Sequence, residues 1–232
     1  MRAIIWLSYT LLVAATPCTL DHSISYSSST APVPVVTMSS SAADMTILIT
    51  NQYGSPLSLS FGLDARSSSP YGNPQPTALP HSSSTRYIYP DGWAGNVAIG
   101  PNLNPNGSKI EGSFINSSVD IDVSYVDGYS VPITCSCEGK AFTGCNLDLF
   151  AGSCEDLTDG PVCLNPARYK AIDGPPTPFF APCAGAAYTF PHDDGANRAS
   201  LSSTCVSCCI GTSCMAPSRQ LPNSTIWAGN TL

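Results

Sequence analysis

Cysteine spacing is the feature that most restricts how this chain can fold. Ten cysteines lie within residues 135–214, whereas a single one, Cys18, precedes them. An even number of cysteines in so short a stretch is typical of a disulfide framework formed in an oxidising compartment. We therefore expect five disulfides, made by Cys135, Cys137, Cys145, Cys154, Cys163, Cys183, Cys205, Cys208, Cys209 and Cys214. The alternative of zinc binding lacks nearby histidine ligands, so we expect no metal site.

The N-terminus predicts the same oxidising location. Arg2 precedes an apolar run at residues 3–15 that ends in small residues, which is the pattern of a secretion signal. We place this signal at residues 1–18, because cleavage there removes Cys18 and leaves ten cysteines. Cleavage before Cys18 is the alternative, and it would leave that thiol unpaired. No later segment has the roughly 20 apolar residues that a membrane-spanning helix requires. The sequence thus predicts a soluble, secreted protein of the extracellular space or the cell wall.

Composition favours strands and turns over helices and excludes one class of partner. Charged residues make up 11% of the chain, and 21 prolines and 18 glycines interrupt potential helices. The net charge of -7 repels a phosphate backbone, so we do not expect nucleic acid as a partner. We expect one domain, acting as a monomer without a cofactor.

Apolar periodicity predicts where the strands lie. A leader rich in Ser, Thr and Pro spans residues 19–43, the domain spans 44–215, and a tail spans 216–232. Within the domain we expect a hairpin of residues 45–51 and 57–62, a second pair at 86–89 and 93–100, and further strands at 110–115 and 119–126. The expected helical turns are 146–150 and 167–171, the second preceded by Asn165 as its N-cap.

The stretch from 118 to 137 joins an all-β half to the cysteine-rich half. Its alternation places Asp120, Asp122 and Ser124 on one face of a strand, and Val119, Ile121, Val123 and Tyr125 on the other. Short strands at this spacing indicate a β-sandwich or barrel. The predicted fold class is therefore all-β, a sandwich that carries a C-terminal disulfide-rich lobe.

Three segments resemble a known family. They are IEGSFI at 110–115, DIDVSYVDGYSVPITCSC at 120–137 and PFFAPCAGAAYTFPHDD at 178–194. Together with the spacing of Cys145, Cys154 and Cys163, they resemble the thaumatin-like family (osmotin, pathogenesis-related group 5), in the compact form associated with fungi. The resemblance implies a thaumatin-like β-sandwich with a disulfide-rich lobe, and the pairs Cys145 with Cys183 and Cys154 with Cys163. The other pairs stay open.

The resemblance also implies a site. The family has an acidic cleft lined by an arginine, a glutamate and three aspartates, which binds β-1,3-glucan and in some members slowly hydrolyses it. By motif position the glutamate falls on Glu111, and two aspartates fall on Asp122 and Asp127. The arginine position falls near Gly100 and the last aspartate at or beside Gly185, so two of the five residues are absent.

These residues allow more than one reading. Glycoside hydrolysis needs an acid and a carboxylate, and our hypothesis assigns Glu111 as acid and Asp127 as base, with Asp122 as the other candidate partner. The structural alternatives are a turn at Asp127-Gly128 and a solvated strand carboxylate at Asp122. His192-Asp193-Asp194 is interpreted as a polar loop rather than a metal site. The aromatic side chains of Tyr125, Tyr129, Tyr188 and Phe190 either stack on sugars or belong to the core.

Three functions follow as hypotheses. The first is binding of β-1,3-glucan or a related cell-wall polysaccharide in an acidic groove, and the second is a weak endo-β-1,3-glucanase that uses Glu111 with Asp122 or Asp127. The third is a non-catalytic interaction with an extracellular protein, as an effector, antigen or inhibitor. Sequons at Asn106, Asn116 and Asn223 are candidate glycosylation sites.

Overall fold

The computed structural model describes residues 44–169, 174–197, 199–201 and 203–220. The predicted signal at 1–18, the leader at 19–43 and the sequon at Asn223 lie outside these ranges. The other two sequons are described, and both Asn106 and Asn116 are exposed. The five described residues after 215 include Gln220, whose side chain exchanges two hydrogen bonds with Asn146. The first residues of the predicted tail therefore contact the domain through Gln220.

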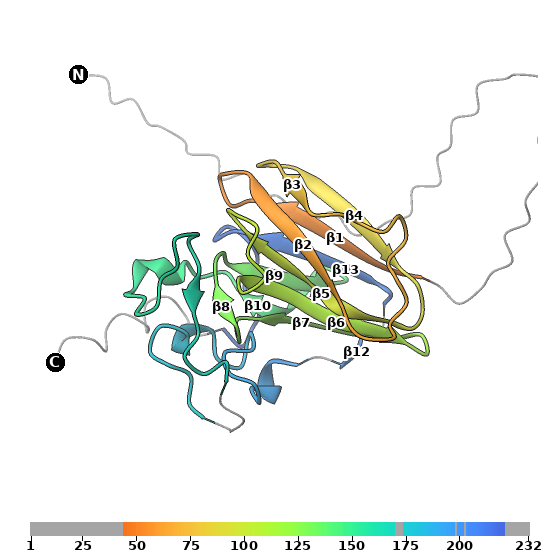
Figure 1. The fold of residues 1–232 in the computed structure, drawn as a ribbon. Helices are drawn as coiled ribbons and strands as arrows, with labels where there is room; N and C mark the ends of the chain where they lie inside the picture. Colours follow the sequence, from red (N-terminus) through yellow and green to blue (C-terminus); the bar gives the residue numbers. More distant parts are fainter. Residues whose placement is uncertain (1–43, 170–173, 198, 202, 221–232) are drawn as a thin grey trace, which may run out of the picture.

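The described chain is nearly all β, as the composition predicts (Figure 1). Its regular helical segments are three short 3₁₀ turns: η1 (Leu149–Ala151), η2 (Ala181–Cys183) and η3 (Asp194–Ala196). Among the described residues there is no helix with the length and apolar character needed to cross a membrane. The strands are β1 (Met45–Asn51), β2 (Leu57–Leu63), β3 (Thr77–Leu79), β4 (Ser84–Tyr89), β5 (Trp93–Gly100), β6 (Ser108–Ile115), β7 (Ser118–Ser124), β8 (Gly128–Tyr129), β9 (Ile133–Cys137), β10 (Lys140–Cys145), β11 (Cys163–Leu164), β12 (Ala199–Leu201) and β13 (Cys205–Ile210).

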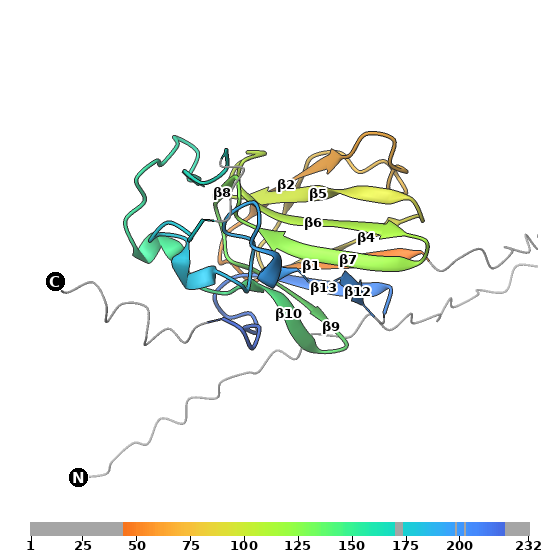
Figure 2. The same cartoon turned by 90° about the horizontal axis from the view of Figure 1, so that it is seen from below.

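Two sheets form the sandwich. One has five strands in the order β10-β9-β13-β1-β4, the other has six in the order β12-β7-β6-β5-β2-β3, and β8 pairs with β11 in a small third sheet. Alternate residues of β1 and β7 point inward, so that Ile47, Ile49, Ile121 and Val123 are completely buried. The predicted sandwich with its C-terminal lobe is confirmed, and Figures 1 and 2 show the lobe at one end of the two sheets.

The two predicted early strand pairs are wrong in their partners. β1 pairs with β13 and β4, and β2 pairs with β5 and β3, so each pair predicted as consecutive strands is divided between the two sheets. The reason is apolar burial across the core. For example, Tyr89 at the end of β4 and Trp93 at the start of β5 are both buried, with ring centroids 4.2 Å apart. Burial of such large aromatic side chains between the two layers stabilises this arrangement of the strands.

The β6–β7 connection is a true hairpin. Its register runs from Lys109 opposite Ser124 to Ile115 opposite Ser118. Asn116 and Ser117 make the two-residue turn with φ of 52° and 62°, and asparagine is favoured in such left-handed positions. Ser117 N–H donates to Asp91, which ties this turn to the β4–β5 corner. The hairpin is therefore fixed in register at both its turn and its pairing.

Disulfides hold the second half together. The described residues contain the pairs Cys135–Cys208, Cys145–Cys183, Cys154–Cys163 and Cys209–Cys214, and Cys205 is also disulfide-bonded. The second and third are the pairs that the family resemblance implies. Within the described residues Cys137 has a free thiol, so the prediction that all ten cysteines pair is wrong there. Cys135 lies directly opposite Cys208, whereas Cys137 lies opposite Lys140.

One buried amide joins the lobe to the sandwich. Asn165 donates through Nδ2 to the carbonyls of Tyr125 and Thr189, and its Oδ1 accepts from Ala167 N–H. The last contact is the cap-like bond that the sequence predicts. Residues 166–169, however, form a turn and not a helix, and 170–171 lie outside the described residues. The other predicted helical turn is η1, capped by Asp148 through a bond from Phe150 N–H.

The Cys135–Cys208 bond is expected to be the stability-determining disulfide of the sandwich. It closes a sequence separation of 73 residues and joins two central strands. In the chain-entropy description a loop of that length gives about 4 kcal/mol. We predict that the double variant Cys135→Ser/Cys208→Ser loses about this much free energy of unfolding in guanidinium titrations. Cys137→Ser is the matched control and is predicted to change it by less than about 0.5 kcal/mol.

A result in which the Cys137→Ser protein is destabilised as strongly as the double variant would contradict this assignment, because it would show that Cys137 carries a structural bond.

Candidate functional site

The outward face of the six-stranded sheet carries a row of polar side chains across three strands. In the register of β5, β6 and β7, Asn96 lies opposite Glu111 and Glu111 lies opposite Asp122. Strand alternation explains the row, because the residues on either side of each point into the core. At the end of the row, Gly62 leaves room for the Asn96 side chain, since a Cβ atom there would lie 2.7 Å from its Nδ2 atom.

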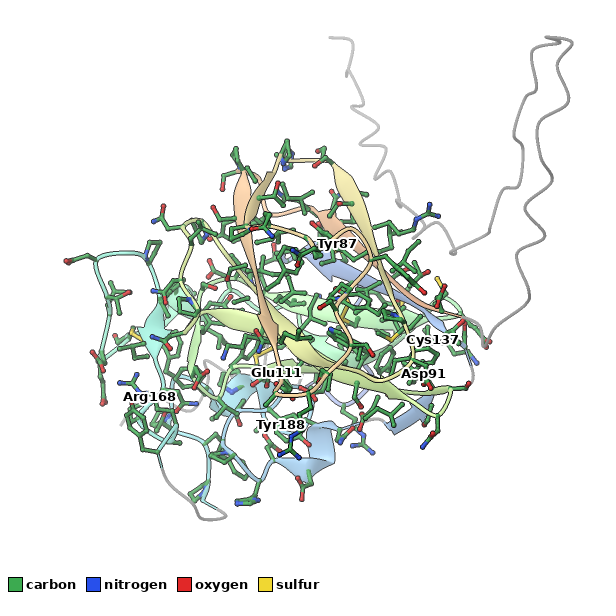
Figure 3. The ribbon with its side chains drawn as sticks, turned by 45° about the vertical axis from the view of Figure 1, so that its right-hand side comes forward. Tyr87, Asp91, Glu111, Cys137, Arg168 and Tyr188 are labelled. Carbon is green, nitrogen blue, oxygen red and sulfur yellow. A yellow bond between two sulfur atoms is a disulfide. The ribbon has the colours of Figure 1, made fainter. Side chains whose placement is uncertain are left out.

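A segment from the lobe lies against the end of β7. Tyr188 N–H donates to Val123 O at 2.9 Å, and Tyr125 N–H donates to Tyr188 O at 2.8 Å. This bridge fixes Tyr188 beside Ser124. In Figure 3, Tyr188 lies on the same side of the molecule as Glu111, and Cys137 lies away from both.

The carboxylate of Asp193 stabilises this segment through hydrogen bonds within it. It is buried and accepts from the N–H of Gly185 and from both the N–H and the hydroxyl of Thr189. Gly185 is the position where the family resemblance places the last aspartate, so an acidic group from eight residues later contacts that position. Asp193 is consequently a structural carboxylate, and the polar-loop interpretation of 192–194 fits its contacts. The described residues contain no group of His, Cys, Asp or Glu arranged to hold a metal ion.

Together these elements form what we call the acidic patch. It consists of Glu111 on β6, Asp120 and Asp122 on β7, and Tyr188, Asp194 and Asn197 on the lobe segment. The charged members of the patch also shift the pKa of their neighbours. Burial is the largest of the causes that together raise the pKa of Tyr188 to about 12, and the charges of Asp122, Asp194 and Asp120 follow in that order. The side chain of Asn197 acts in the opposite direction and lowers the pKa of Tyr188.

Asp122 is the most perturbed carboxyl of the patch. Burial, followed by the charges of Glu111 and Asp120, raises its pKa to about 8. Its Oδ1 atom and that of Asp120 are buried and make no hydrogen bond within the described part of the chain. Asp122 therefore keeps its proton at neutral pH, which makes it a hydrogen-bond donor in a row of acceptors.

Asp127 has a different environment. It forms an ion pair with Lys109, whose side chain is 13% exposed, against 38% for Asp127. Its backbone carbonyl accepts from Asn165 N–H, and the chain continues directly into β8. The predicted turn between two paired runs is therefore absent, because β7 and β8 belong to different sheets. Lys109 supplies a positive charge two residues from Glu111 on the same strand face.

Part of this site can be predicted from the sequence. Glu111 and Asp122 are brought together, and Asp127 lies apart in its ion pair with Lys109. Lys109 could have been found from the alternation that it shares with Glu111. Asp194 and Asn197 could not, because nothing in the sequence places their loop beside β7. Of the four aromatic candidates, Tyr125 and Tyr129 are completely buried core residues, and Tyr188 is partly exposed at the patch.

No family model matches the sequence, and no curated protein matches it. A comparison with solved structures aligns this chain with the protein elicitor MoHrip2 from Magnaporthe oryzae, with a TM-score of 0.37 and 12% identity. That alignment covers 72% of this chain and 98% of the other chain.

From the raised pKa of Asp122 we predict how the free energy of unfolding depends on pH. The folded state keeps the proton up to about pH 8, whereas the unfolded chain releases it near the ordinary aspartate value. Between these two values the unfolded state binds fewer protons, so this group lowers stability progressively as pH rises. We predict that Asp122→Asn is more stable than the unmodified chain at pH 8 by roughly 2 kcal/mol or more, with the difference shrinking towards pH 4.

Urea titrations across this pH range measure the difference. Asp159→Asn is the control, because Asp159 is exposed and outside the acidic patch. A difference between Asp122→Asn and the unmodified chain that does not change with pH would contradict the assigned pKa.

Proposed function

We propose that this chain is a secreted, thaumatin-like protein that binds β-1,3-glucan or a related neutral cell-wall polysaccharide at the acidic patch. Sugars present hydroxyl groups that donate to carboxylates, and ring faces that pack on aromatic side chains. The patch offers both kinds of group, with Glu111 as acceptor and Tyr188 as the partly exposed ring. Four described disulfides are compatible with an oxidising location.

The observation that carries the proposal is the direct opposition of Glu111 and Asp122 beside Tyr188. A sheet holds these groups in fixed positions, so a ligand pays little to order them. The acidic surroundings also favour a neutral polymer over an anionic one, since the net charge is -7 and the cation nearest to Glu111 on its own strand, Lys109, is paired with Asp127.

A second candidate function is weak endo-hydrolysis of the same polymer, and one observation favours it. Directly opposed residues of an antiparallel pair have Cβ atoms about 5 Å apart, which suits the carboxyl separation of roughly 5 Å in retaining glycosidases. Asp122 holds a proton at neutral pH and would serve as the acid, with Glu111 as nucleophile. This order differs from the sequence hypothesis, in which Glu111 is the acid and Asp127 the base.

Binding is tested by co-sedimentation of the folded, oxidised protein with insoluble β-1,3-glucan. We predict that Glu111→Gln weakens binding about tenfold, because a charged acceptor is lost, and that Asp159→Asn leaves it unchanged. Hydrolysis is followed in parallel as release of reducing ends from laminarin, and in the enzymatic case Asp122→Asn lowers the rate by about a hundredfold or more.

Binding without release of reducing ends supports the first function alone. Absence of both signals in a folded protein would contradict both glucan functions and favour an interaction with an extracellular protein.

A further inference from the structure

Glu111 and Asp122 face each other in conditions that disfavour two charges. They occupy opposed positions in the β6–β7 register, and Asp120 lies two residues from Asp122 on the same strand face. Within the described residues, the buried Oδ1 atoms of Asp120 and Asp122 accept no hydrogen bond that would compensate a charge. We propose that Glu111 and Asp122 hold one proton between them, and that binding of polysaccharide at the acidic patch depends on this proton. This inference rests on the proposed function.

The surroundings of Asp122 consist mostly of acids. The charges that act on Asp122 are those of Glu111 from β6 and Asp120 from β7, and Lys109 lies two residues from Glu111 on the same strand face. From the lobe segment, Tyr188 is coupled to Asp122, Asp194 acts on Tyr188, and Arg219 donates to Gly195 O beside Asp194. Lys109 forms an ion pair with Asp127, so its positive charge is largely neutralised there. Tyr188 stays neutral because its pKa is about 12. Asn96, the partner of Glu111 on β5, carries no charge. The balance of charge near Asp122 is therefore negative, which favours the neutral acid.

A neutral ligand strengthens this preference. When sugar displaces water from the patch, the ionised form of Asp122 loses solvation, whereas the protonated form donates its O–H to a sugar hydroxyl. Binding therefore raises the pKa of Asp122 further. By reciprocity, a ligand that raises this pKa by one unit binds about tenfold more tightly to the protonated protein. Affinity is then high at acidic and neutral pH and falls once the pH exceeds the pKa of Asp122.

The test is calorimetric titration of the folded protein with a short, soluble β-1,3-linked glucose oligomer, from about pH 5 to about pH 9.5. We expect the dissociation constant to rise about tenfold across the upper part of this range. Near pH 8, runs in two buffers of different ionisation enthalpy are expected to show net uptake of protons on binding. The protons come from the buffer and protonate Asp122.

Three variants connect the effect to the pair. Asp122→Asn is neutral at every pH and is expected to bind with no pH dependence in this range. Glu111→Gln removes one cause of the raised pKa, so its midpoint is expected at lower pH even though its binding is weaker. Asp159→Asn, an exposed control outside the patch, is expected to keep the profile of the unmodified protein.

The possible results distinguish failure of the shared-proton proposal from failure of glucan binding itself. Binding whose strength is constant over the whole range overturns the inference and leaves glucan binding intact. A pH dependence that persists in Asp122→Asn also overturns it, because another group would then be responsible. Binding at no pH by a folded protein overturns the proposed function and the inference with it.

Discussion

The pairing of β6 with β7 is the constraint on which the rest of the site depends. Its register decides that Ile110, Ile121 and Val123 enter the core while Glu111 and Asp122 face outward. A shift of one residue would exchange the two faces and bury carboxylates among apolar side chains, at a cost of several kcal/mol. The same apolar burial that stabilises the sandwich thus keeps two acids opposite each other. The short Asn116-Ser117 turn fixes that register at its end.

The lobe completes the patch and makes it more acidic. Tyr188 is joined to β7 by backbone hydrogen bonds, and the Cys145–Cys183 bond and the carboxylate of Asp193 hold its segment in place. Covering the end of the strand removes Asp122 from water and raises its pKa. The cost appears as reduced stability at neutral pH, and a strained electrostatic arrangement of this kind is more common at functional sites than elsewhere.

Much of the fold could be predicted because it depends on local patterns. Alternation identified most of the long strands, including both that carry Glu111 and Asp122, and cysteine density identified the lobe. The partners of β1 and β2 could not be predicted, since pairing across a sandwich is decided by burial between segments distant in sequence. The free thiol of Cys137 has the same cause, because only the register shows that it faces Lys140. For the site, alternation yields Glu111 and Asp122, whereas Asp194 and Asn197 depend on how the lobe docks.

The most direct measurement of the central claim is a map of backbone amide shifts in NMR spectra when a β-1,3-linked glucose oligomer is added. We predict that the shifts concentrate on β6 and β7 around Glu111 and Asp122 and on the segment that carries Tyr188. Shifts confined to surfaces away from the patch, such as the exposed loops at Leu103 and Leu157, would contradict it.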